Sequence, residues 1–350
     1  LVRRLERRPP DPGKYREGDA EESGILARWA VLGAGAVLVV VGMNLAWSVR
    51  DVPLETTQVA KPETGDAPAG EPKPSAVKLP APPSDETVLA NWPSFRGPFG
   101  LAASPTAQPP LAWNGETGVN LRWKVAIPMP GFGSPVVWEN RVFLTGADKT
   151  AQTVFCFDLD TGVQLWTAEV SGVPGSPAEP PATQDDTGLA APTPACDGRI
   201  LVVLFGTGDI AAFDPDGKPL WSRNLGVPKN PYGHSSSPLI DRDRVIVQFD
   251  DQVKGRMMAL DAATGGTAWE TDRKVLPCWS TPQMVREKDR TLIVACGSPL
   301  CGAYDADTGK AVWEAEVMGS TEVGASPAVG EGTAYFCNEF AVLSAHDLRT

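Results

Sequence analysis

The apolar residues of the chain follow two patterns that predict different elements. From Trp29 to Trp47 the sequence WAVLGAGAVLVVVGMNLAW has no charged residue, and Asn44 is its only strongly polar side chain. An α-helix of this length spans about 28 Å at ~1.5 Å per residue, which is close to the thickness of one hydrocarbon core. The run therefore predicts a membrane-spanning helix over residues 29–47.

The basic residues around this run predict its orientation. Seven Lys or Arg side chains precede it, whereas the first fifteen residues after it hold two, Arg50 and Lys61. Because Lys- and Arg-rich flanks stay in the cytoplasm, we expect residues 1–28 in the cytoplasm and the rest of the chain in the periplasm. A cleaved signal peptide would have a shorter apolar run and a small-residue cleavage site, which we do not find near Ser48. The sequence thus favours an uncleaved, single-pass signal anchor.

Residues 48–90 predict a linker. The stretch 51–90 has eight Pro and no aromatic residue, with Ala, Glu and Lys filling most of the rest. Such a segment has too little apolar surface to order itself, and its prolines favour an extended spacer.

Residues 91–350 follow the second pattern, in which short apolar runs alternate with turn residues. One recurring unit has an Asp, a short turn ending in Gly, and a Trp four residues after that Gly. Its four copies are Asp158, Gly162 and Trp166; Asp214, Gly217 and Trp221; Asp261, Gly265 and Trp269; and Asp305, Gly309 and Trp313. A second marker, Pro after a small residue, opens an apolar run at Pro135, Pro194, Pro238, Pro282 and Pro327. The two markers share a period near 44 residues, and Trp123 resembles the end of an earlier copy.

Each repeat is interpreted as four short strands. One strand follows the Pro, a second follows a turn rich in Asp, Gly or Asn, a third leads to the Asp, and the fourth carries the Trp. Four short antiparallel strands per repeat are typical of a β-propeller blade. The pattern predicts an all-β fold, with about five four-stranded blades over residues 91–350.

The recurring turn has a physical explanation. The Asp carboxylate can accept hydrogen bonds from backbone N–H groups two or three residues later. The Gly supplies the positive φ that a tight turn often needs. The Trp is expected to lie between neighbouring blades, with its ring N–H donating to a carbonyl.

On these residues the chain resembles the pyrroloquinoline-quinone (PQQ)-like repeat family of bacterial propellers, whose blades carry this Asp–Thr–Gly–Trp docking motif. The opening NWPSFRGPFG at residues 91–100 is also similar to the start of such propellers. The resemblance implies a ring of seven or eight blades and two functional classes. Some members are quinoprotein dehydrogenases, whereas others bind no quinone, among them an outer-membrane assembly lipoprotein that acts as a scaffold.

The chemistry of the dehydrogenase class finds little support in the sequence. Those enzymes typically have a disulfide between adjacent Cys, a calcium ion and an Asp base, and none of the six Cys here is adjacent to another. The Asp-rich turns at Asp158 and Asp305 have Gly at position five, whereas a helix–loop–helix calcium loop has it at position six. We therefore assign no catalytic, cofactor-binding or metal-binding residue and expect no cofactor, with PQQ and calcium as the alternative.

Two pairs of residues remain open to more than one interpretation. Cys296 and Cys301 flank a four-residue turn, so they either form a disulfide or are buried unpaired. The two histidines are His234, which lies just before a predicted first strand, and His346. For His234, contact with a ligand competes with ordinary loop hydrogen bonding.

The charge narrows the class of partner. The formal net charge is −12, and residues 91–350 carry 20 basic and 30 acidic side chains. An acidic surface argues against nucleic acid and favours a protein or small-molecule ligand on the propeller face. We expect a membrane-anchored, periplasmic, non-catalytic binding or scaffolding module. The alternative is a PQQ-dependent dehydrogenase oxidising alcohols or sugars, and carbohydrate binding by the face loops is a third possibility.

The repeat is expected to continue past Thr350. Residues 345–350 align with residues 303–308, so a Gly should follow, and then a docking Trp four residues later. We therefore expect this sequence to be a fragment whose last blade is incomplete. We expect two or three further blades to follow it in the natural chain. Because Leu1 is not Met, the N-terminus is also expected to be incomplete.

Overall fold

The computed structural model describes residues 77–105, 108–319, 322–338 and 343–349. These residues fall within one structural unit. The predicted membrane span at residues 29–47 lies outside the described residues. Within the described ranges, no helix is long and apolar enough to cross a membrane.

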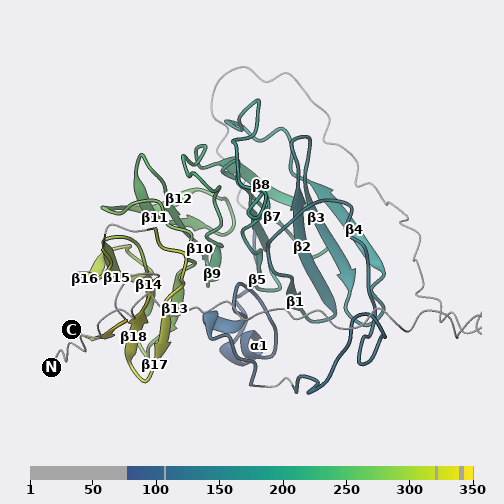
Figure 1. The fold of residues 1–350 in the computed structure, drawn as a ribbon, viewed down its shortest axis with the longest axis horizontal. Helices are drawn as coiled ribbons and strands as arrows, with labels where there is room; N and C mark the ends of the chain where they lie inside the picture. Colours follow the sequence, from purple (N-terminus) through teal and green to yellow (C-terminus); the bar gives the residue numbers. More distant parts are fainter. Residues whose placement is uncertain (1–76, 106–107, 320–321, 339–342, 350) are drawn as a thin grey trace, which may run out of the picture. The chain divides into compact units, whose positions relative to one another are not determined.

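Five antiparallel sheets follow one another along the chain (Figure 1). The first contains β1 (Val136–Trp138), β2 (Arg141–Ala147), β3 (Gln152–Asp158) and β4 (Gln164–Glu169). The second contains β5 (Ala195–Cys196), β6 (Leu201–Leu204), β7 (Asp209–Phe213) and β8 (Pro219–Asn224). The third contains β9 (Leu239–Asp241), β10 (Arg244–Asp250), β11 (Gly255–Asp261) and β12 (Thr267–Arg273). The fourth contains β13 (Gln283–Arg286), β14 (Thr291–Ala295), β15 (Leu300–Asp305) and β16 (Ala311–Glu316). The fifth contains β17 (Ala328–Gly330), β18 (Thr333–Phe336) and β19 (Ser344–Asp347).

Strands that are consecutive in sequence pair within each sheet, which is the arrangement of a propeller blade. The predicted all-β propeller is therefore confirmed. In each of the first four blades the register shifts where the third strand meets the fourth, just before the Asp of the recurring turn. A bulge at this point increases the local twist of the outer strand.

The core lies between neighbouring blades rather than in one central body. Phe143 of the first blade and Phe213 of the second are buried in one apolar cluster. Val202 of the second and Phe249 of the third share another. Since each blade buries its faces against the next, the stability of one blade depends on its neighbours.

The described N-terminal segment, residues 77–102, contacts several blades. It contains α1 (Asp85–Leu89) and a short 3-10 turn η2 (Pro98–Gly100). Ser84 caps α1 by accepting from the Thr87 N–H, and Asp85 forms an ion pair with Arg286 of the fourth blade. The predicted linker extended to residue 90, whereas here residues 77–90 lie against the propeller.

The motif at residues 91–100 lies along the innermost strands. Trp92 forms a β-bridge with Val137 of β1, and the Pro93 carbonyl accepts from the Cys196 N–H of β5 (2.8 Å). Arg96 donates to the Pro327 carbonyl (3.1 Å), just before β17. The segment thus connects blades that are far apart in sequence.

Candidate functional site

Three of the four recurring turns have the same hydrogen bonds. One carboxylate oxygen of Asp158 accepts from the Thr161 N–H (2.8 Å) and the Thr161 hydroxyl (2.7 Å). Asp261 makes the same contacts with Thr264, and Asp305 with Thr308. Asp214 instead accepts from the Asp216 and Lys218 N–H groups. These hydrogen bonds hold the Asp side chains within their own turns.

Three of the four docking Trp residues contact the turn of the following blade. The ring N–H of Trp166 donates to the Pro215 carbonyl (3.2 Å), that of Trp221 to Ala262 (2.8 Å) and that of Trp269 to Ala306 (3.0 Å). Trp123 donates to the Leu159 carbonyl (2.8 Å) in the same way. The indole rings lie against Gly162, Gly217, Gly265 and Gly309.

Trp313 differs from the other copies. Its ring stacks on His346 with a centroid distance of 5.4 Å and meets the edge of Phe336 at 6.1 Å. Its ring nitrogen has no hydrogen-bond partner among the described residues. The docking residues are thus parts of blade interfaces, and the structure does not bring them together into a site.

A second set of residues joins neighbouring blades at the start of their innermost strands. The hydroxyl residue before each of the last four Pro markers accepts a hydrogen bond from the backbone N–H of its counterpart in the preceding blade. Ser134 donates to Thr193, Thr193 to Ser237, Ser237 to Thr281 and Thr281 to Ser326, at 2.9–3.0 Å. We call these five residues the hydroxyl chain. The small residue before Pro was the signal for it in the sequence, but its role was not predicted.

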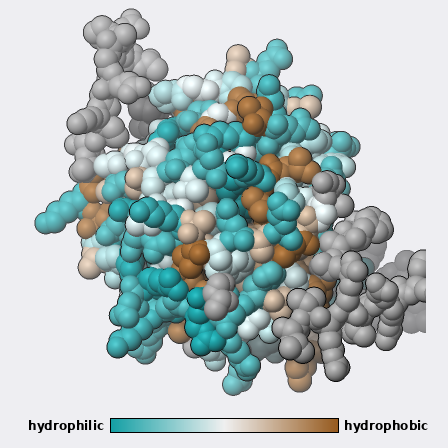
Figure 2. All heavy atoms as spheres, turned by 90° about the vertical axis from the view of Figure 1, so that its left-hand side faces the viewer, coloured by the Kyte–Doolittle hydropathy of each residue, from teal (hydrophilic) through white to brown (hydrophobic). Residues whose placement is uncertain are grey.

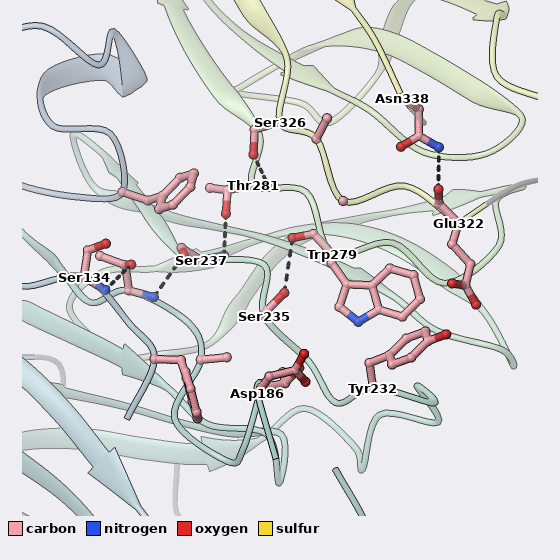
Figure 3. Close-up of a pocket in the computed structure, with 17 residues that line it drawn as sticks. Ser134, Asp186, Tyr232, Ser235, Ser237, Trp279, Thr281, Glu322, Ser326 and Asn338 are labelled. Carbon is pink, nitrogen blue, oxygen red and sulfur yellow. Dashed lines mark hydrogen bonds between the residues drawn. The ribbon is translucent and has the colours of Figure 1, made fainter. Parts of the chain in front are cut away.

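The hydroxyl chain lines a cavity of about 690 Å³, which we call the axial cavity (Figure 3). Thr193, Ser237 and Thr281 are nearly fully buried. Phe95 of the N-terminal segment lines the same cavity. This volume lies within the range of about 300–1,000 Å³ that is typical of small-molecule sites.

Aromatic and acidic side chains form the rest of the lining. Trp279 and Tyr232 lie together (Figure 3), with ring centroids 5.1 Å apart and an edge contact. The Trp279 ring N–H donates to the Gly233 carbonyl (2.9 Å), which fixes the position of the indole. Asp186 and Glu322 contribute carboxylates, and no Lys or Arg is among the described residues that line the cavity.

This lining does not fit PQQ, the cofactor that the family resemblance implies. PQQ carries three carboxylates, and burying them requires positively charged partners. The axial cavity offers two carboxylates and no described cation. Nor do the described residues contain a cluster of three or more His, Cys, Asp or Glu side chains suited to a metal ion.

Three of the five buried cysteines, Cys278, Cys296 and Cys301, share one apolar cluster at the fourth blade. The Sγ atoms of Cys296 and Cys301 lie 3.0 Å apart, which is longer than a covalent S–S bond of about 2.05 Å. The Cys278 thiol donates to the Cys296 carbonyl (3.2 Å), and burial raises the pKa of Cys278 to about 12. Both thiols of the candidate disulfide are free in this structure, so the disulfide stays a prediction.

His234 lies fully buried beside Phe249, with ring centroids 4.8 Å apart. Neither ring nitrogen makes a hydrogen bond of normal geometry with a described residue. Burial lowers the pKa of His234 to about 4, so its imidazole is neutral at pH 7. His234 itself does not line the axial cavity, although its neighbours Ser235 and Ser237 do.

The sequence matches the family model described as "Outer membrane protein assembly factor BamB" over residues 100–230 and 152–350. The Outer membrane protein assembly factor BamB of Burkholderia pseudomallei is 25% identical over 209 residues, which cover 58% of this chain and 49% of that protein. The chain therefore spans about half the length of this relative.

Solved structures give similar partial alignments. BamB from Moraxella catarrhalis aligns with a TM-score of 0.44 and 19% identity, covering 64% of this chain and 62% of that one. Quinohemoprotein alcohol dehydrogenase ADHIIG from Pseudomonas putida HK5 aligns with a TM-score of 0.49 and 18% identity, covering 70% of this chain and 43% of that one. Because the family model matches well over half of the sequence, this chain belongs to the family described as outer membrane protein assembly factor BamB, within the PQQ-like propellers.

Proposed function

We propose that this chain is a membrane-anchored, extracytoplasmic propeller that docks a partner protein during outer-membrane protein assembly and catalyses no reaction. The family match over residues 100–350 is the observation that carries this proposal. The hydrogen bonds between blades support it, because they make a rigid body that can hold a partner in one orientation.

The loops on the side of the axial cavity are the proposed docking surface. Three of them present exposed apolar side chains at Val227, Val253 and Leu276. On the face that Figure 2 shows, brown residues lie among hydrophilic ones. Because burial of apolar surface drives association, these three exposed side chains favour a protein partner on this side.

Photo-crosslinking in the full chain tests this proposal. A photoreactive residue replaces Val253 on the cavity side or, as a matched control, Val163 in a docking turn at the other end of the blades; both positions are exposed. We expect Val253, and not Val163, to cross-link a component of the outer-membrane protein assembly machinery. We also expect deletion of the gene to lower the amount of folded outer-membrane β-barrel proteins. Unchanged levels of these proteins, together with no assembly component captured from either position, would contradict the proposal.

A further inference from the structure

The axial cavity has hydrogen-bond donors that its own residues leave free. Each hydroxyl oxygen of Thr193, Ser237 and Thr281 accepts one backbone N–H. None of these three hydroxyl groups has an acceptor for its own hydrogen among the described residues. A buried hydroxyl without an acceptor is unfavourable. The cavity therefore favours a ligand that presents acceptor atoms to the hydroxyl chain.

The aromatic residues add flat apolar surfaces to this polar wall. Trp279 is held by its hydrogen bond to Gly233 (2.9 Å) and by the edge contact with Tyr232. Phe132 and Phe95 line the same cavity. Side chains that are fixed before binding lose little conformational entropy when a ligand stacks on them.

The charge of the lining selects among ligands. Asp186 and Glu322 repel anions and accept hydrogen bonds, and no described cation in the lining offsets them. A peptide C-terminus would bring a carboxylate near these two groups. A peptide N-terminus would bring an ammonium group that Asp186 and Glu322 attract, so a tripeptide is the competing ligand that the experiment includes.

We propose that the axial cavity binds the neutral end of an oligosaccharide. Each sugar hydroxyl both accepts and donates, so it matches the free donors of the hydroxyl chain and the acceptors Asp186 and Glu322. The C–H faces of a sugar ring stack on aromatic surfaces such as Trp279. This ligand site does not depend on the proposed protein-docking role.

Binding is measured on the full chain in detergent by calorimetric titration and Trp fluorescence. The probes are the neutral trisaccharides maltotriose and N,N′,N″-triacetylchitotriose, the anionic trisaccharide trigalacturonic acid and the tripeptide Ala-Ala-Ala. We expect at least one neutral trisaccharide to bind, and the anionic trisaccharide and the tripeptide to bind at least tenfold more weakly.

Two variants locate the binding. Trp279→Ala should weaken binding of the neutral trisaccharide at least tenfold, whereas Trp113→Ala, which removes a Trp that is 75% exposed and does not line the cavity, should leave it unchanged. Thermal denaturation of both variants checks that they are folded. Asp186→Asn tests the charge: it should reduce the discrimination against trigalacturonic acid.

The proposal is overturned if neither neutral trisaccharide binds at millimolar concentration. It is also overturned if the anionic trisaccharide or the tripeptide binds more tightly than the neutral sugars. Sugar binding that is the same in folded Trp279→Ala as in the unaltered chain would place the sugar outside the axial cavity and overturn it as well.

Discussion

At the residue scale, the glycine of each docking turn meets two separate constraints. Gly217 has a φ of 87°, a conformation that residues with a side chain rarely adopt. A Cβ at this position would also lie 2.7 Å from the Trp166 indole of the preceding blade. The turn and the blade interface therefore both require glycine here.

Gly172 provides a matched control for this interpretation, because its φ is 65° and a Cβ there would meet nothing within 4 Å. Gly172→Ala should lower the free energy of unfolding by about 1–2 kcal/mol, the cost of left-handed backbone. Gly217→Ala should cost about 1–3 kcal/mol more, because the Trp166 ring must also move. Urea denaturation of the two variants measures the difference, and equal losses would contradict the contact between the blades.

The buried imidazole of His234 predicts a pH dependence of stability. Its pKa is about 4 in the folded protein and ordinarily about 6.5, so below pH 6.5 the unfolded chain binds a proton that the folded chain does not. The contribution of His234 to stability is therefore fully present above pH 6.5 and is lost as the pH falls towards 4. This loss lowers the free energy of unfolding by about 3 kcal/mol.

His234→Phe removes the titrating group and keeps a ring beside Phe249. We expect this variant to lose less stability between pH 7 and pH 4 than the unaltered chain, as measured by urea unfolding at each pH. The same pH dependence in both proteins would show that His234 does not titrate as its burial requires.

At the element scale, the hydroxyl chain links the start of each innermost strand to the next blade. The Thr193 N–H is buried and donates to the Ser237 hydroxyl (3.0 Å), across 44 residues of sequence. A buried N–H without an acceptor costs about 1–3 kcal/mol. These hydrogen bonds therefore contribute to the stability of every blade interface they cross.

Ser236 and Ser237 allow a direct test, since both are buried and only one is in the hydroxyl chain. Ser237→Ala should lower the free energy of unfolding by about 1–3 kcal/mol, because it leaves the Thr193 N–H without its acceptor. Ser236→Ala should be neutral or stabilising, because the Ser236 hydroxyl has no partner among the described residues. Thermal denaturation compares the two variants. An equal loss of stability in both would contradict the structural role of the hydroxyl chain.

The blades were predictable because their signals are local. The Pro that opens each strand, the Asp turn and its Gly all lie within a few residues of the structure they determine. The partner of each Trp was not predictable, since Trp166 contacts the carbonyl of Pro215, 49 residues later. The hydroxyl chain and the axial cavity were missed for the same reason: their members come from five different blades.

At the scale of the whole molecule, the N-terminal segment is more ordered than its composition predicts. The Pro-rich composition predicted an extended linker up to residue 90, yet Pro80 accepts a hydrogen bond from Arg199 (3.2 Å) and Asp85 pairs with Arg286. These partners lie in the second and fourth blades, more than 100 residues away. The composition of residues 77–90 reflects only the segment itself, whereas the surface against which the segment packs comes from distant blades.

The six cysteines provide a native probe of the predicted topology. Cys337 is exposed, whereas the other five are buried, and burial raises the pKa of Cys156 and Cys278 to about 12. Because the thiolate is the reactive form, a maleimide at neutral pH should modify Cys337 before the others in the folded protein. If residues 29–47 span a membrane, this single accessible thiol reports on which side of it the propeller lies.

If the predicted helix over residues 29–47 leaves the propeller in the periplasm, a membrane-impermeant maleimide should label Cys337 in intact spheroplasts as completely as after lysis. The physical reason is the positive-inside rule, by which the basic residues before Trp29 are expected in the cytoplasm. Cys337→Ser gives the background, and labelling is quantified by mass spectrometry of the peptide that contains residue 337. Labelling that appears only after lysis would place the propeller in the cytoplasm. That result would contradict both the predicted topology and the proposed docking role in outer-membrane protein assembly.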